Sequence, residues 1–204
     1  MHLKIKLAGG GFLIAENYIR FIDIAWTTIY MLRNIKFLIF FLLVAGCGMK
    51  PSIEDNKLSN REFLLEEFFA GETRAYGQFQ DVLGNVSRRF VVNIVGRWDG
   101  INLVLTEDFI YEDGSEERRV WNLVKTSENN WVGSADGVVG TAQGKTSGDM
   151  FYWTYTIDLP TPDGERRVSF KDYMWMLSED RVLNKAYMSK WGIPLGEVTI
   201  IFED

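Results

Sequence analysis

From Thr73 to the C-terminus, the chain repeats short segments in which apolar and polar residues alternate, separated by turn sequences. The segments are about 8 to 13 residues long and rich in Val, Ile, Thr, Tyr, Phe and Trp, which favour strands. Four Asp-Gly pairs, at 99–100, 113–114, 136–137 and 163–164, and Leu-Gly-Asn at 83–85 mark the turns. Asp-Gly between alternating segments predicts type I′ hairpins, in which both central residues have positive φ.

This pattern gives about nine or ten strands, nearly all joined by short turns. Short turns between successive strands make neighbouring strands antiparallel. We therefore predict an all-β fold, an up-and-down antiparallel β-barrel of about 8–10 strands. A Greek-key β-sandwich is the alternative, although it would require longer crossover connections.

One short helix is predicted before the strands. Residues 59–62 match the S-x-x-E capping box, and Gly71 follows as a stop signal. We therefore expect a helix over about residues 60–69. Its buried side would consist of Phe63, Leu64, Phe68 and Phe69.

The N-terminal part of the chain has a different pattern. Met31 is followed by Arg33, Lys36 and an unbroken apolar run over residues 37–45. A basic start, an apolar core and small residues at its end describe a secretory signal. The run is shorter than the roughly 20 residues of a membrane-spanning helix. A buried apolar helix is the alternative.

The signal ends in a motif that explains the single cysteine. Val-Ala-Gly-Cys at 44–47 resembles the bacterial lipobox, in which a signal peptidase cuts before the cysteine and the thiol carries a diacylglyceryl group. We expect cleavage between Gly46 and Cys47, with Cys47 as the lipid attachment point. Gly48, where aspartate would favour inner-membrane retention, favours the outer membrane and its periplasmic face. In the alternative, Cys47 is a small buried side chain.

The chain thus divides into four expected parts. Residues 1–30 would be an unusually long extension before the basic region, so we expect translation to start at Met31 and residues 1–30 to be a mis-assigned upstream extension. An extension that lies on a membrane is the alternative. The signal peptide covers 31–46, a polar tether 47–59, and the β-barrel domain 60–204.

Charge and composition exclude several classes of function. The net charge is −6 and no basic cluster offsets it, which argues against a nucleic-acid partner. The only histidine is His2, so a chain that starts at Cys47 would contain no histidine and no free thiol. Such a chain excludes Ser-His-Asp and Cys-His catalysis and histidine-ligated metals, so we expect no metal, no cofactor and no enzymatic activity. The glycine-rich segment 133–148 matches no phosphate-loop motif, and glycines in strands mark bends or close approaches.

Six motifs together resemble a known family, the proteobacterial lipoproteins catalogued as domain of unknown function 3833. They lie at residues 69–71, 77–81, 88–90, 111–114, 135–140 and 184–192. The likeness covers about residues 60–204. It implies a lipocalin-like β-barrel at the cell envelope without an assigned reaction, and the family's genes tend to lie near those of lipid-modifying enzymes, which suggests lipid handling.

Alternation identifies a candidate ligand-cavity face. Phe151, Trp153, Tyr155 and Ile157 share one face of their strand. Such rings could fill a packed core or line a cavity for an acyl chain or similar apolar ligand. Both interiors occur in barrels of this size, so the two alternatives stay open.

Polar residues interrupt two other apolar rows. Asp172 lies in the row of Val168, Phe170 and Met174, and Asn184 lies in the next strand, where Lys190 continues its face. A buried carboxylate needs a partner, which Arg119 or Lys190 could supply. Asp172 and its partner could also bind the head group of a ligand. Alternatively, they could form a purely structural ion pair, or this row of side chains could face solvent.

Three functions are therefore open. The first is a non-enzymatic module that binds a lipid or another apolar small molecule. The second is an envelope scaffold or accessory subunit for a lipid-modifying system, docked through an exposed aromatic patch. The third is a cofactor-free lipid isomerase or cyclase that uses Asp172 with Tyr173 or Tyr187.

Overall fold

A computed structural model describes residues 30–31, 50–54, 59–161 and 164–204. The chain divides into two units, Met1–Lys50 and Pro51–Asp204, and the second contains the β-barrel. The predicted cleavage site at Gly46 and Cys47, Gly48 and nearly all of the predicted signal lie outside the described residues. In the described segments, no helix has the length and apolar character needed to cross a bilayer.

Ten antiparallel strands form a closed barrel. Each strand pairs with the next in sequence, and the last strand pairs with the first, which closes the ring. This confirms the predicted up-and-down barrel and rules out the sandwich. The strands are β1 (Gly71–Asp81), β2 (Val86–Trp98), β3 (Asn102–Tyr111), β4 (Glu116–Ser127), β5 (Asn130–Ser134), β6 (Ala142–Ser147), β7 (Met150–Thr161), β8 (Gly164–Ser178), β9 (Arg181–Lys190) and β10 (Ile193–Glu203).

The Asp-Gly turns at 99–100, 113–114 and 136–137 lie where the sequence predicts them but are not type I′, and Asp163 of the fourth pair lies outside the described residues. Gly100 and Gly114 have positive φ, 103° and 79°, whereas the only described non-glycine residue with positive φ is Trp191. In the β2–β3 turn, the Asp99 carboxylate accepts hydrogen bonds from the backbone N–H groups of Ile101 and Asn102 at 2.9 and 2.7 Å. The aspartate thus supplies turn hydrogen bonds with its side chain, and only the glycine takes the left-handed conformation.

The predicted helix is shorter than expected. Helix α2 spans only Leu65–Phe68, and no side chain caps its N-terminus. The Ser59 hydroxyl donates to the Asp149 carboxylate at 2.5 Å instead of capping a helix. The Phe63 backbone N–H donates to the Gly148 carbonyl at 2.7 Å, which ties the segment before the helix to the β6–β7 turn.

The segment around α2 closes one end of the barrel. Phe63, Leu65, Phe68 and Phe69 are buried, whereas Leu64, which we expected to be buried, is exposed. The Phe69 ring packs edge-on against Phe68 and Phe202, with ring centroids 4.9 and 5.3 Å apart. Burial of each large apolar side chain stabilises the fold by about 1.5–3 kcal/mol. We call this end the closed end.

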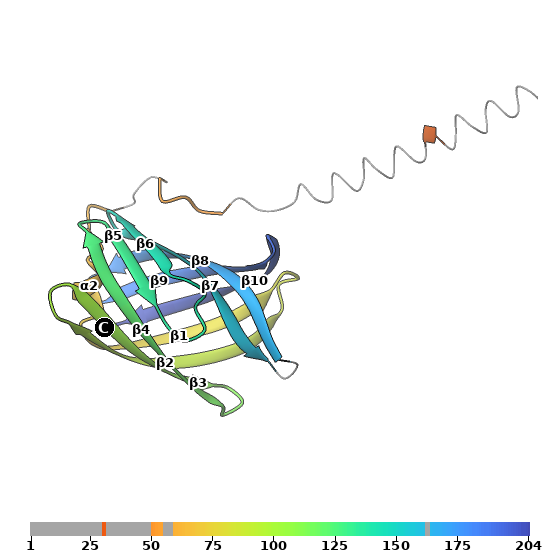
Figure 1. The fold of residues 1–204 in the computed structure, drawn as a ribbon, viewed down its shortest axis with the longest axis horizontal. Coiled ribbons are helices and arrows are strands. Elements are labelled where there is room, and N and C mark those ends of the chain that lie inside the picture. Colours follow the sequence, from red (N-terminus) through yellow and green to blue (C-terminus); the bar gives the residue numbers. More distant parts are fainter. Residues whose placement is uncertain (1–29, 32–49, 55–58, 162–163) are drawn as a thin grey trace, which may run out of the picture. The chain divides into compact units, whose positions relative to one another are not determined.

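The opposite end carries the β1–β2, β3–β4, β5–β6, β7–β8 and β9–β10 connections, and we call it the mouth. Figure 1 shows α2 and the C-terminus at the closed end and the yellow β1–β2 turn at the mouth. Strand β6 is shorter than its neighbour β7, and the β5–β6 connection extends the pairing through a bridge between Val138 and Ile157.

The glycine-rich segment forms strands around an indole, not a phosphate loop. A Cβ atom at Gly133 or at Gly144 would lie 2.6 Å from the Trp153 ring. Side chains at these positions of β5 and β6 would therefore displace the ring. This is the close approach that the sequence predicts for glycine in strands.

Candidate functional site

The barrel encloses a cavity of about 470 Å³. The cavity extends from Leu65 and Phe69 at the closed end to Ser87, Arg88 and Pro160 near the mouth. Inward-facing residues of β1–β4 and β7–β10 form its wall. Its volume is within the roughly 300–1,000 Å³ of pockets that hold small organic ligands.

The predicted aromatic row borders this cavity. Phe151, Trp153, Tyr155 and Ile157 of β7 are all among its lining residues. The rings also pack against one another and the wall, with the Trp121 centroid 5.5 Å from that of Trp153 and 5.1 Å from that of Tyr155. The row is therefore both core and cavity wall, and the two alternatives are not exclusive.

A polar group lies within this largely apolar wall. It consists of Glu107 on β3, Arg119 on β4, Tyr155 on β7, Asp172 on β8 and Asn184 on β9. Glu107 and Arg119 are direct cross-strand neighbours. The cavity thus has a polar region formed by five strands, and we call these five residues the polar cluster.

Burial changes the ionisation of the polar cluster. Desolvation raises the pKa of Asp172 to about 7, although a hydrogen bond from the Asn184 amide opposes the rise. Desolvation also raises the pKa of Glu107 to about 7, and the Arg119 guanidinium opposes that rise. The pKa of the Tyr155 phenol lies well above its usual value because of burial and the nearby Asp172 carboxylate.

The predicted ion pairs of Asp172 are absent from the described part of the chain, where no salt bridge within 4.0 Å joins it to Arg119 or Lys190. Arg119 instead donates to the Glu117 carboxylate at 2.6 Å. Lys190, the last residue of β9, lies outside the cavity lining, with its ammonium nitrogen 4.7 Å from the Trp191 ring centroid. Asp172 and Arg119 come from strands that are not neighbours, and the partner of Asp172 is the adjacent Asn184.

The two tyrosines proposed to act with Asp172 do not line the cavity. Successive strand residues point to opposite faces, so Tyr173 points away from the side that Asp172 occupies. Its ring packs against those of Tyr152 and Tyr187, with centroids 5.0 and 5.9 Å away. The tyrosine of the polar cluster is Tyr155, which the sequence analysis placed in the apolar row.

Glu107 was not among the predicted site residues, although its sequence context carries the signal. Leu103, Leu105, Glu107 and Phe109 form another apolar row that contains one carboxylate. The same signal identified Asp172.

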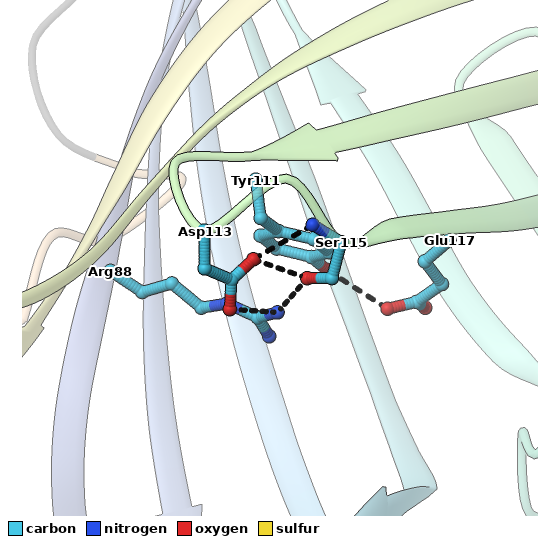
Figure 2. A network of polar contacts seen from close by, with 5 residues as sticks. All are labelled: Arg88, Tyr111, Asp113, Ser115 and Glu117. Carbon is cyan, nitrogen blue, oxygen red and sulfur yellow. Dashed lines mark hydrogen bonds and ion pairs between the residues drawn. The ribbon is translucent and has the colours of Figure 1, made fainter.

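A second polar network, also missed, lies near the mouth (Figure 2). The Tyr111 hydroxyl donates to Glu117 at 2.8 Å, and the Arg88 guanidinium lies 3.4 Å from the centroid of the Tyr111 ring. Arg88 also donates to the Ser115 hydroxyl at 2.9 Å and pairs with Asp113 at 3.8 Å. These contacts fix the β3–β4 turn beside the cavity opening.

In the described ranges, no group of three or more His, Cys, Asp or Glu side chains is arranged to hold a metal ion.

The sequence of residues 41–204 matches the family described as "Protein of unknown function (DUF3833)". The chain belongs to this family. The match covers the whole barrel and confirms the resemblance found in the sequence motifs. A search of curated proteins found no match.

Three solved structures are similar to this chain at low sequence identity. The S-type phycobiliprotein lyase CPES from Guillardia theta is 9% identical, with a TM-score of 0.51, covering 69% of this chain and 90% of the lyase chain. Rv2717c from M. tuberculosis is 14% identical, with a TM-score of 0.48 and coverages of 66% and 91%. EF1p2_mFAP2b bound to DFHBI is 8% identical, with a TM-score of 0.38 and coverages of 67% and 94%. The likeness to the lyase shows a shared lipocalin-like barrel and nothing about activity.

Apolar side chains protrude at the mouth of the DUF3833 barrel. Two hairpin tips, β1–β2 and β9–β10, are neighbours because β1 pairs with β10. The four most exposed apolar residues of these tips are Val82, Leu83, Trp191 and Ile193. Trp191 is 88% exposed and Leu83 is 83% exposed. We call these four residues the mouth patch.

Proposed function

We propose that this protein is a lipid-anchored envelope protein that binds a lipid or another apolar small molecule inside its barrel. The observation that carries the proposal is the cavity of about 470 Å³, whose apolar wall surrounds a buried polar cluster. Apolar walls with a few convergent polar groups are typical of small-molecule sites.

The two parts of the cavity would have different tasks. The apolar wall would take the hydrocarbon part of the ligand, and each methylene transferred from water contributes about 0.8 kcal/mol. The polar cluster would orient the polar end. The lining extends to the mouth, where Ser87 and Pro160 lie beside the hairpin turns, so the ligand would enter there.

The anchor is the second part of the proposal. Its support is the sequence around Cys47, where a basic flank, an apolar run and small residues precede the cysteine. We place the protein on the periplasmic face of the outer membrane. The tether of residues 47–59 would reach roughly 40 Å when extended, enough for the barrel to reorient beside the membrane.

Ligand binding is tested on the full chain purified from its own cells and held in lipid nanodiscs. We expect native mass spectrometry to show a bound lipid or apolar metabolite. We also expect N-phenyl-1-naphthylamine, a neutral fluorescent probe, to bind in excess over empty nanodiscs and to be displaced by that molecule. If nothing copurifies and the probe does not bind above the blank, the binding function is wrong.

The anchor is tested by labelling cells with radioactive palmitate. We expect label in the full-length chain and none in the Cys47→Ala variant, because the thioether and the N-terminal acyl chain both require this residue. Cys47→Ala should also leave the membrane fraction. Label that persists in the variant would contradict the lipobox assignment.

A docking role is the second candidate and is favoured by the mouth patch. Exposed tryptophan and leucine on neighbouring hairpin tips are typical of surfaces that contact a partner or a membrane. In this alternative the protein would be an accessory subunit of a lipid-modifying system. The N-phenyl-1-naphthylamine experiment distinguishes the two candidate functions. Ligand binding requires that the probe enter the cavity, whereas docking through the mouth patch does not.

A further inference from the structure

We infer that the ligand of this cavity carries a head group that donates hydrogen bonds, a hydroxyl or a protonated amine, and that Asp172 and Asn184 accept these bonds. This inference rests on the proposed binding function and names the chemical class of its ligand. A carboxylate head group, as in a fatty acid, would not fit.

Two buried acceptor atoms carry the argument. Asp172 is 6% exposed and Asn184 is 2% exposed, and both line the cavity. One carboxylate oxygen of Asp172, Oδ1, and the amide oxygen of Asn184, also Oδ1, have no hydrogen-bond partner among the described residues. Buried polar atoms are nearly always hydrogen-bonded, so these two lack a donor that the protein does not supply.

The donors near these two oxygens do not form hydrogen bonds with them. The Asn184 amide N–H group bonds to Asp172, which leaves only the amide oxygen free. Arg119 donates to Glu117 at 2.6 Å. The Tyr155 phenol interacts with the Asp172 carboxylate electrostatically but does not satisfy its free oxygen. When Asp172 is ionised, a donor for the two oxygens would therefore have to come from the cavity.

The position of the free atoms points to the ligand. The other two buried side-chain atoms without a partner in the described residues belong to Thr73 and Trp131, and neither residue lines the cavity. Asp172 and Asn184 are on adjacent strands, with Asp172 opposite Ala186 and Asn184 opposite Met174 in the register. The two acceptors thus form one site in the wall.

The charges around the two acceptors favour a head group that donates hydrogen bonds over an anionic one. Glu107, Glu117 and Asp172 contribute three carboxyl groups around the guanidinium of Arg119, and the other lining guanidinium, that of Arg88, lies near the mouth. An anionic head group would add negative charge beside two unpaired acceptors and three carboxyl groups, which is unfavourable in a desolvated site. A hydroxyl satisfies the acceptors without charge, and an ammonium also offsets the excess of carboxylates.

The test compares three ligands that share a chain and differ only in the head group. Dodecylamine, 1-dodecanol and dodecanoate are mixed at equal concentration with the full chain in nanodiscs, and native mass spectrometry measures the bound fraction of each. At pH 7.5 we expect the amine and the alcohol to bind at least tenfold better than the carboxylate. Empty nanodiscs correct for partitioning into lipid.

The variant Asp172→Asn tests the site directly. It removes the charge but keeps an acceptor of the same shape, so we expect it to lose the preference for the amine over the alcohol and to keep binding the alcohol. The matched control is Asp158→Asn, also on the barrel wall but with an exposed salt bridge to Arg167 at 2.8 Å. It should keep the ranking of the native chain.

The pH gives an independent readout. The carboxyl groups of Asp172 and Glu107 lose protons as the pH rises through about 7, while the amine remains protonated. The preference for the amine over the alcohol should therefore increase between pH 5.5 and pH 8 in the native chain, and much less in Asp172→Asn.

The outcomes separate this inference from the proposed function. If none of the three ligands binds, the binding function itself fails. If all three bind equally, or if dodecanoate binds best, the cavity binds apolar molecules but the head-group inference is wrong. The inference is also wrong if Asp172→Asn keeps the native ranking and its pH dependence.

Discussion

Replacing Ala186 with tryptophan is expected to weaken binding of N-phenyl-1-naphthylamine at least tenfold while the barrel stays folded. Ala186 is 3% exposed, lines the cavity and lies opposite Asp172 in the register. An indole at this position would occupy space that the ligand needs, next to the polar cluster. A tenfold loss corresponds to about 1.4 kcal/mol of binding free energy.

The matched control is Leu183→Trp, on the same strand but with its side chain on the outer face of the barrel, since Asn184 and Ala186 face the cavity. It adds an indole without filling the cavity, so we expect native probe affinity. Thermal unfolding followed by circular dichroism shows whether each variant is folded. Overpacking in a filled core would cost about 1–3 kcal/mol, and the cavity should absorb much of that cost in Ala186→Trp. Native probe affinity in a folded Ala186→Trp would place the binding site outside the cavity.

Replacing Gly96 with alanine is expected to destabilise the protein by about 3 kcal/mol or more. Gly96 is on β2, and a Cβ atom there would lie only 1.6 Å from the backbone oxygen of Phe69. This contact is with backbone, so no rotamer change relieves it. The alanine would push the segment around α2 away from the wall and open the closed end. Urea unfolding of the full chain measures the change.

The control for this prediction is Val95→Ala, the preceding residue on β2. Val95 is 41% exposed on the outer face, and surface substitutions of this kind usually change stability by less than about 0.5 kcal/mol. A Gly96→Ala variant as stable as Val95→Ala would mean that the closed end can rearrange freely around Phe69.

The barrel was predictable because its determinants are local. Alternation along each strand and turn sequences between the strands predict about nine or ten strands, of which the structure has ten, and short connections leave few arrangements other than a meander. The turn type was not predictable in the same way. Asp99 can supply hydrogen bonds from its carboxylate, and the sequence does not show whether the backbone or the side chain will do so.

The helix shows where a local motif fails. The capping box at 59–62 is a local pattern, but Ser59 bonds to Asp149, a residue 90 positions away. Phe63 likewise bonds to Gly148. These long-range contacts tie the segment to the β6–β7 turn, and only Leu65–Phe68 is helical.

The candidate site was predictable in its residue types but not in its pairing. A polar residue in an apolar row identifies Asp172, and the same rule would have identified Glu107. Strand order and the distance from the mouth determine which side chains meet inside the barrel. As a result, Lys190 lies outside the cavity lining and Arg119 lies beside Glu107. Whether the barrel contains a cavity depends on the total volume of the inward-facing side chains relative to the space inside the barrel. The alternation of apolar and polar residues does not predict this.

The pairing of β1 with β10 also determines when the protein can fold. Arg74 lies opposite Glu203 in this seam, so the ring needs the last residues of the chain before it closes. Contacts of such high sequence separation form slowly. Until they form, β1 and β10 each expose an unpaired edge, the kind of edge that recruits other chains. A chain that stops before Ile193 would lack β10, so the edges of β1 and β9 would stay unpaired permanently, and the chain would aggregate rather than accumulate as a smaller barrel.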